Sequence, residues 1–135
     1  IHQTGASMFV GVCRLSFHLP GNHSLKGKRS IVRRLIDRTR IRFNAAVAEV
    51  ADNDRHEVAR IGVCVVGNSA SHVDSMLNHI AVFMEQLGVA VPAGRQTEVI
   101  AMGDEFGEQS PFPVPEEVDA VGAFEPMDDE EELDR

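Results

Sequence analysis

The strongest chemical feature of this sequence is a dense array of basic side chains between positions 26 and 42, opposed within that segment only by Asp37. Its eight members are Lys26, Lys28, Arg29, Arg33, Arg34, Arg38, Arg40 and Arg42. Such side chains bind phosphate backbones by neutralising charge and releasing counterions, and arginine also forks onto phosphate oxygens. The array therefore predicts a phosphate- or RNA-binding surface. The alternatives are an ordinary solvated helix face, a protein partner and the chain's own acidic C-terminal segment.

The other polar residues form no catalytic or metal-binding pattern. Glu49 and Asp52 are near in sequence, as structural carboxylates of a strand and turn often are. Cys13 and Cys64 match no disulfide framework or metal motif, and we expect both to be buried. Five histidines lack the spacing of metal ligands and are interpreted as surface or capping residues: His18, His23, His56, His72 and His79. We expect no catalytic residue, metal or cofactor, and hence no enzyme; a small enzyme with a site formed in a dimer is the alternative.

The segment that carries the basic array is predicted to form a helix. Ser24 is a suitable N-cap, and the helix is predicted to reach about Phe43. At about 100° per residue, one apolar stripe forms, as in a helix that packs on a sheet. It consists of Leu25, Val32, Leu35, Ile36, Thr39 and Phe43. The eight bases occupy the other sides, so we expect them to face outward.

The segment before this helix, Met8 to Leu19, predicts a strand with two unlike faces. Val10, Val12 and Arg14 alternate with a more apolar set, which is typical of a sheet covered on one side only. The open face could hold single-stranded RNA, but the stacking aromatics that such a site uses are missing there. We therefore predict that Val10, Val12 and Arg14 form a homodimer interface.

The remaining segments complete a β-α-β-β-α-β order. We predict further strands at 44–50, 56–66 and 97–102, and a second helix that begins after Gly67–Ser69 and stops at Gly88. A turn at Pro92–Gly94 should precede the last strand. The order favours an α+β ferredoxin-like sandwich: a four-stranded antiparallel sheet with both helices on one face, and the first and third strands central.

Charge divides the chain into a body and a tail. Residues 104–135 contain thirteen acids and one base, a net charge of −12, so the total of −8 leaves +4 for the residues before them. We predict an unstructured leader or tag at 1–7, a folded domain at 8–103 and a disordered acidic tail at 104–135. The tail is expected to solubilise the domain, or to contact the basic helix transiently. No apolar run or secretory signal indicates a membrane, so a cytoplasmic protein is expected.

Two stretches resemble a known family: HSLKGKRSIVRRLIDRTRIRFNAAVAEV from His23 to Val50, and RIGVCVVGNSASHVDSML from Arg60 to Leu77. They resemble the YlxP-like family, a bacterial domain of unknown function (the family numbered 503), over roughly residues 8–102. The resemblance implies a ferredoxin-like fold. In some bacteria its members lie among genes for translation factors and ribosome maturation, which implies RNA or the ribosome as a partner. The family usually has Glu at the position of Gly27, so we expect a looser helix entry here.

Overall fold

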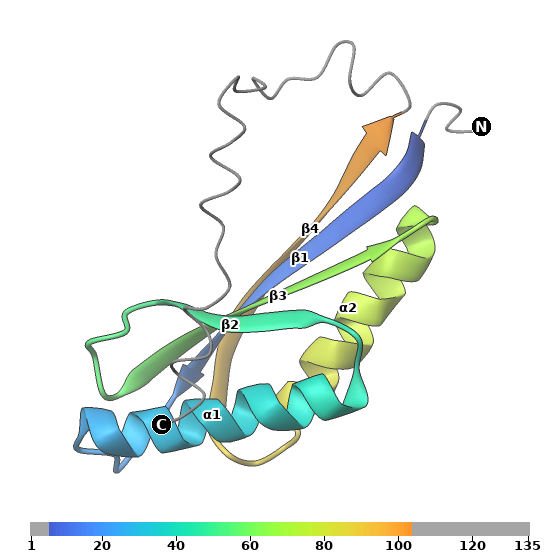
Figure 1. The fold of residues 1–135 in the computed structure, drawn as a ribbon. Helices are drawn as coiled ribbons and strands as arrows, with labels where there is room; N and C mark the ends of the chain where they lie inside the picture. The colour runs from blue at the N-terminus through green and yellow to red at the C-terminus, as the bar shows by residue number, and fades with distance from the viewer. Residues whose placement is uncertain (1–5, 104–135) are drawn as a thin grey trace, which may run out of the picture. The chain divides into compact units, whose positions relative to one another are not determined.

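The computed structural model describes residues 6–103, which form four strands and two helices (Figure 1). The elements follow the predicted order: β1 (Ala6–His18), α1 (Leu25–Arg42), β2 (Ala46–Ala51), β3 (Val58–Gly67), α2 (Ala70–Glu85) and β4 (Val91–Gly103). Most boundaries lie within two residues of the predicted ones.

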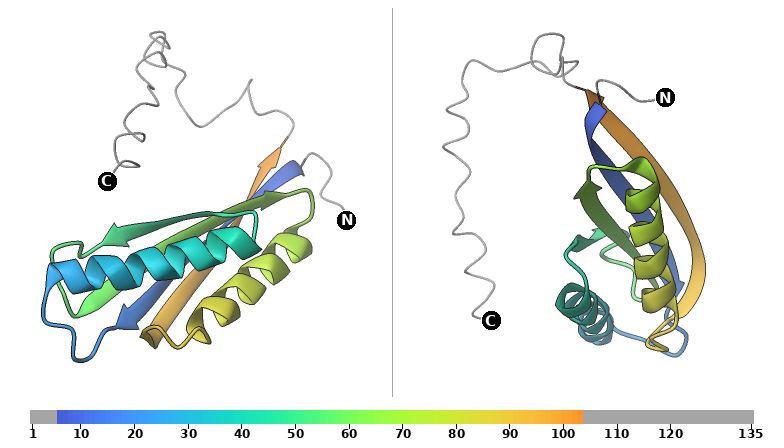
Figure 2. Two further views of the ribbon diagram at one scale, coloured as in Figure 1. Left: turned by 60° about the horizontal axis from the view of Figure 1, so that its bottom comes forward. Right: turned by 90° about the vertical axis from the view of Figure 1, so that its right-hand side faces the viewer.

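The four strands form one antiparallel sheet in the order β2-β3-β1-β4. The first and third strands are therefore the central pair, as predicted. Both helices cover the same face of the sheet (Figure 2). The predicted α+β ferredoxin-like arrangement is confirmed by this topology.

The core lies between that face and the helices. From β1 it takes Phe9, Cys13, Leu15 and Phe17. Every second side chain of β1 is thus buried, as in a strand of a sheet that is covered on one face. α2 packs closely on β1 at Gly11, where an added Cβ would lie 2.5 Å from Val73 Cγ1 and 2.7 Å from a Leu77 methyl. This position therefore has no room for a side chain.

The largest error in the predicted elements concerns β4. It begins at Val91 rather than Thr97, and Pro92–Gly94 is part of the strand rather than a turn. β4 is an edge strand, where the missing N–H of a proline can face away from the ladder. Gly94 has a φ of +136° at the register shift opposite Ser16, which only glycine adopts readily.

Both predicted flanking segments fall largely outside the described residues. β1 begins at Ala6, so the last two residues of the predicted leader belong to the strand. Residues 1–5 and the predicted disordered tail at 104–135 are not described.

Candidate nucleic-acid interface

α1 begins at a cap that two neighbouring side chains hold in place. Ser24 Oγ accepts the N–H of Gly27 at 2.9 Å. Asn22 donates from Nδ2 to Ser24 O at 2.9 Å and to His56 O at 2.5 Å, and its Oδ1 fills the space that a Cβ at position 27 would need. Asn22 therefore ties the helix entry to the turn that precedes β3.

The exposed bases of α1 form two rows rather than one uniform surface. At about 100° per residue, row 1 and row 2 lie roughly 160° apart around the helix. Row 1 consists of Arg29, Arg33 and Arg40, and row 2 of Arg34, Arg38 and Arg42; all six are exposed. Between them runs an outward ridge of Ser30, Asp37 and Ile41, of which Ile41 is 85% exposed. Lys26 lies between row 1 and the ridge, in the first turn.

Each row is anchored to a neighbouring element. Arg40 donates from Nη2 to the backbone carbonyl of Val47 at 3.0 Å, and row 1 borders a recess of about 350 Å³ between α1 and β2. Arg42 lies 5.1 Å from the ring centre of Phe83 on α2 and 5.7 Å from that of Phe43, both cation–π distances. Row 1 thus faces β2 and row 2 faces α2.

Most of these bases have no acidic partner within residues 6–103. No ion pair there involves Lys26, Arg29, Arg33, Arg34 or Arg38. Like charges four residues apart on a helix repel by a few tenths of a kcal/mol each. Within the described residues, the two rows therefore form a surface of largely uncompensated positive charge, to which an anionic ligand is complementary.

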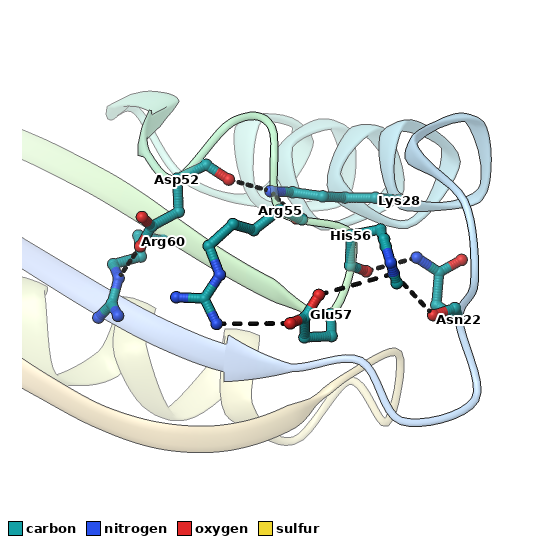
Figure 3. Close-up of polar contacts among 7 residues, drawn as sticks. All are labelled: Asn22, Lys28, Asp52, Arg55, His56, Glu57 and Arg60. Atoms are coloured by element: carbon teal, nitrogen blue, oxygen red, sulfur yellow. Dashed lines mark hydrogen bonds and ion pairs between the residues drawn. The ribbon is translucent and has the colours of Figure 1, made fainter.

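The prediction of a binding role is wrong for one of the eight basic residues, Lys28, because its side chain is buried. Lys28 is 2% exposed, and its Nζ donates to the carbonyls of Asp52 at 2.6 Å and Arg55 at 2.7 Å (Figure 3). Glu49 Oε2 lies 2.9 Å from Nζ without a well-aligned hydrogen bond, so this contact is an ion pair. Lys28 is therefore a structural residue that fastens the β2–β3 hairpin to α1, and it is not available to a nucleic acid.

A signal for this role was present in the sequence. Lys28 stands three residues after Leu25 and four before Val32, on the buried stripe itself. That stripe also takes in Leu35 and Thr39, whose hydroxyl donates to Leu35 O at 2.7 Å. A charge on a packing stripe needs a buried partner, and Glu49 of β2 supplies one.

The same hairpin holds a second acid–base pair. Arg60 Nε donates to Asp52 Oδ2 at 2.7 Å (Figure 3). Arg60 Nη1 also donates to Ser16 Oγ at 3.0 Å. The hydrogen bond from Arg60 is the main cause that lowers the pKa of Asp52, with nearby positive charges adding to it. Asp52 also has a φ of +53°, a left-handed conformation that aspartate tolerates better than most residues. Glu49 and Asp52 thus bind different bases and do not act together.

The open face of the sheet carries the three residues predicted for a dimer interface. Val10, Val12 and Arg14 all point away from the helices, and Arg14 donates to Gln96 Oε1 at 2.6 Å. Five of the seven large hydrophobic side chains exposed in the described part of the chain lie on the same face. They are Met8, Val50, Val66, Val91 and Ile100.

A shallow hollow of about 860 Å³ lies on this face. It forms because Ala46, Ala48 and Gly62 on β2 and β3 are small, and Val12 also lines it. Cys64 lies at its border and is half-buried, whereas Cys13 on the opposite face is buried as expected. The prediction that both cysteines are buried was therefore wrong for Cys64, since neither helix of the described chain covers its face of the sheet.

Other kinds of site find little support in the described residues. Within 6–103, no three His, Cys, Asp or Glu side chains are grouped as a metal site would require. No helix in this part of the chain is long and apolar enough to cross a membrane. The predicted surface or capping role fits His56, whose Nδ1 lies 3.2 Å from Asn22 O.

Comparisons with known proteins agree with the sequence and add no activity. A family model described as "Protein of unknown function (DUF503)" matches residues 10–92. Among solved structures, "De novo designed protein Ferredog-Diesel" is 11% identical, with a TM-score of 0.37 over 73% of this chain and 89% of that one. "De novo designed protein Foldit4" is 12% identical, with a TM-score of 0.39 over 70% and 96%. No curated protein matches. Since the family model covers more than half of the chain, the protein belongs to the DUF503 family of unknown function.

Proposed function

We propose that this protein is a non-enzymatic, cytoplasmic RNA-binding protein that acts at the ribosome, with α1 as its binding surface. The observation that carries the proposal is the pair of exposed basic rows, most of whose members have no acidic partner within residues 6–103. The genes that accompany related family members support the choice of RNA and the ribosome. Lys28, which the sequence had assigned to this surface, is left out because it is buried.

The number of exposed bases sets the expected salt dependence. Each phosphate neutralised adds roughly 0.7 to 0.9 to the slope of log affinity against log salt. About six contacts would therefore weaken binding about a thousandfold between 50 and 200 mM salt. A protein that binds RNA by other means would show a much smaller slope.

Fluorescence anisotropy with a labelled structured RNA in a salt series tests this proposal. The double variant Arg33→Gln/Arg34→Gln removes one base from each row and should lower the salt slope by about two. The matched control is Arg55→Gln/Arg95→Gln, which loses the same charge from surface ion pairs outside α1. Absence of salt-dependent binding, or equal losses in the two double variants, would show that α1 is not an RNA-binding surface.

The open sheet face favours a second function, a homodimeric interaction module. Four strands at about 4.8 Å spacing, and the ten paired residues of β1 and β3 at about 3.3 Å each, give a face of about 600 Å² in plan. This approaches the roughly 800 Å² per partner of a standard interface. The face also carries both charge signs, Arg14 and Glu98, which could pair across a twofold contact.

Light scattering across a concentration series tests the dimer. Val66→Lys places a charge on the open face, where Val66 is 60% exposed, and should shift the mass to that of a monomer. Ile41→Lys makes the same change at an exposed residue of α1 and should leave the dimer intact. A wild-type protein that stays monomeric at high concentration would rule this function out.

A further inference from the structure

The two rows on α1 face opposite sides of one helix. Row 1 borders the recess beside β2, and row 2 ends at Arg42 over the Phe83 ring of α2. At about 1.5 Å per residue, row 1 spans about 17 Å from Arg29 to Arg40 and row 2 about 12 Å from Arg34 to Arg42, on a helix about 10 Å wide. Two parallel lines of positive charge on either side of a helix match two phosphate strands that flank it.

From this geometry we propose that the ligand of α1 is double-stranded RNA, with the helix lying along the minor groove and one basic row on each strand. This inference rests on the proposed RNA-binding function and specifies its substrate. The minor groove of A-form RNA is wide and shallow, and proteins contact its phosphates and 2′-hydroxyl groups rather than its sequence. A single strand could follow only one of the rows.

The ridge between the rows has a composition that suits this groove. It carries no base; its exposed polar residues are Ser30 and Asp37, which can hydrogen-bond to 2′-hydroxyl groups that both donate and accept. Asp37 would be unfavourable directly against phosphates; it lies on the ridge side of row 1 and lines the same recess as the three row 1 arginines. Ile41, 85% exposed, can contact sugar atoms at the groove floor.

The alternative substrate, single-stranded RNA, lacks a stacking platform on the open face of the described sheet. Sheet domains that read single strands stack bases on exposed aromatic side chains. Within residues 6–103, Phe9 and Phe17 are buried on the helix side of the sheet. Phe43 and Phe83 pack edge to face against each other, with ring centres 5.4 Å apart, beneath Arg42. None of these four phenylalanines lies on the open face.

The experiment compares three probes with the full chain: an RNA duplex of about 20 base pairs, longer than the roughly 16 that a duplex-binding domain spans, one of its strands alone, and a DNA duplex of the same sequence. We expect the tightest binding to duplex RNA, and a salt slope for the single strand about half as steep, because it engages one row. Duplex DNA should bind more weakly than duplex RNA, since it has no 2′-hydroxyl groups.

Two row-specific variants complete the test. Arg29→Gln/Arg33→Gln weakens row 1 and Arg34→Gln/Arg38→Gln weakens row 2 at equal charge. Each should lower the slope for duplex RNA by about two. If the single strand binds as tightly as the duplex, or only one row matters, the duplex assignment is wrong while RNA binding by α1 stands. If none of the probes binds with a salt-dependent affinity, the proposed function fails together with the inference.

Discussion

Replacing Lys28 by methionine should destabilise the fold strongly while leaving the RNA affinity of the folded protein unchanged. The methionine keeps most of the apolar volume but removes the ammonium group. Two hairpin carbonyls, those of Asp52 and Arg55, then lose a charged donor, and Glu49 loses its counter-ion. The perturbation therefore isolates the polar role of Lys28.

The magnitude follows from the burial of the pair. Removing one partner of a buried ion pair costs about 3–5 kcal/mol. Because the Glu49 side chain keeps 18% exposure and can be partly rehydrated, we expect the lower end, about 3 kcal/mol. For a domain of this size that corresponds to a fall in Tm of roughly 12–24 °C.

Urea denaturation followed by circular dichroism measures the effect, with Lys26→Met as the control. Lys26 is on the same helix two residues earlier, is exposed and forms no ion pair within residues 6–103, so its replacement should change stability by less than about 0.5 kcal/mol. A Lys28→Met variant as stable as Lys26→Met would refute the structural role of Lys28. A loss of RNA affinity in folded Lys28→Met, beyond that of Lys26→Met, would return Lys28 to the binding surface.

Three other perturbations test the fold and the open face. Gly11→Ala should destabilise the protein by about 1–3 kcal/mol in urea denaturation, because its Cβ would meet Val73 of α2; unchanged stability would mean that α2 does not approach β1 so closely. The hydrogen bond from Arg60 lowers the pKa of Asp52 in the folded protein below its ordinary 3.8. The ionised Asp52 therefore contributes its full stabilisation of the fold above pH 3.8, and this contribution is lost as the pH falls through the lowered pKa. Asp52→Asn should therefore be less stable than the wild type at pH 7, with a difference that shrinks in acid below pH 3.8; a difference that grows in acid would contradict this sign. Cys64 should react with a thiol reagent in dilute native protein and become protected at concentrations where a dimer forms, and equal reactivity at all concentrations would argue against an interface there.

The sheet and both helices could be predicted from sequence because their signals are local. Alternation along β1 and the 3.6-residue stripe of α2 depend only on which side of an element meets the core. The edge position of β4 is not local, and for that reason Pro92–Gly94 was wrongly predicted to be a turn. A proline and a glycine usually indicate a turn. They can also lie within an edge strand, because such a strand pairs on one side only and can contain a bulge.

The sequence by itself determined the basic character of α1, its apolar stripe and the order of elements, because composition and spacing are properties of the chain alone. Only the tertiary structure decided which bases are exposed. Lys28 is buried because the β2–β3 hairpin packs over the start of α1. The hairpin places Glu49 and the carbonyls of Asp52 and Arg55 next to the ammonium group of Lys28. The separation of the remaining arginines into a row beside β2 and a row beside α2 likewise depends on what packs against each side of the helix.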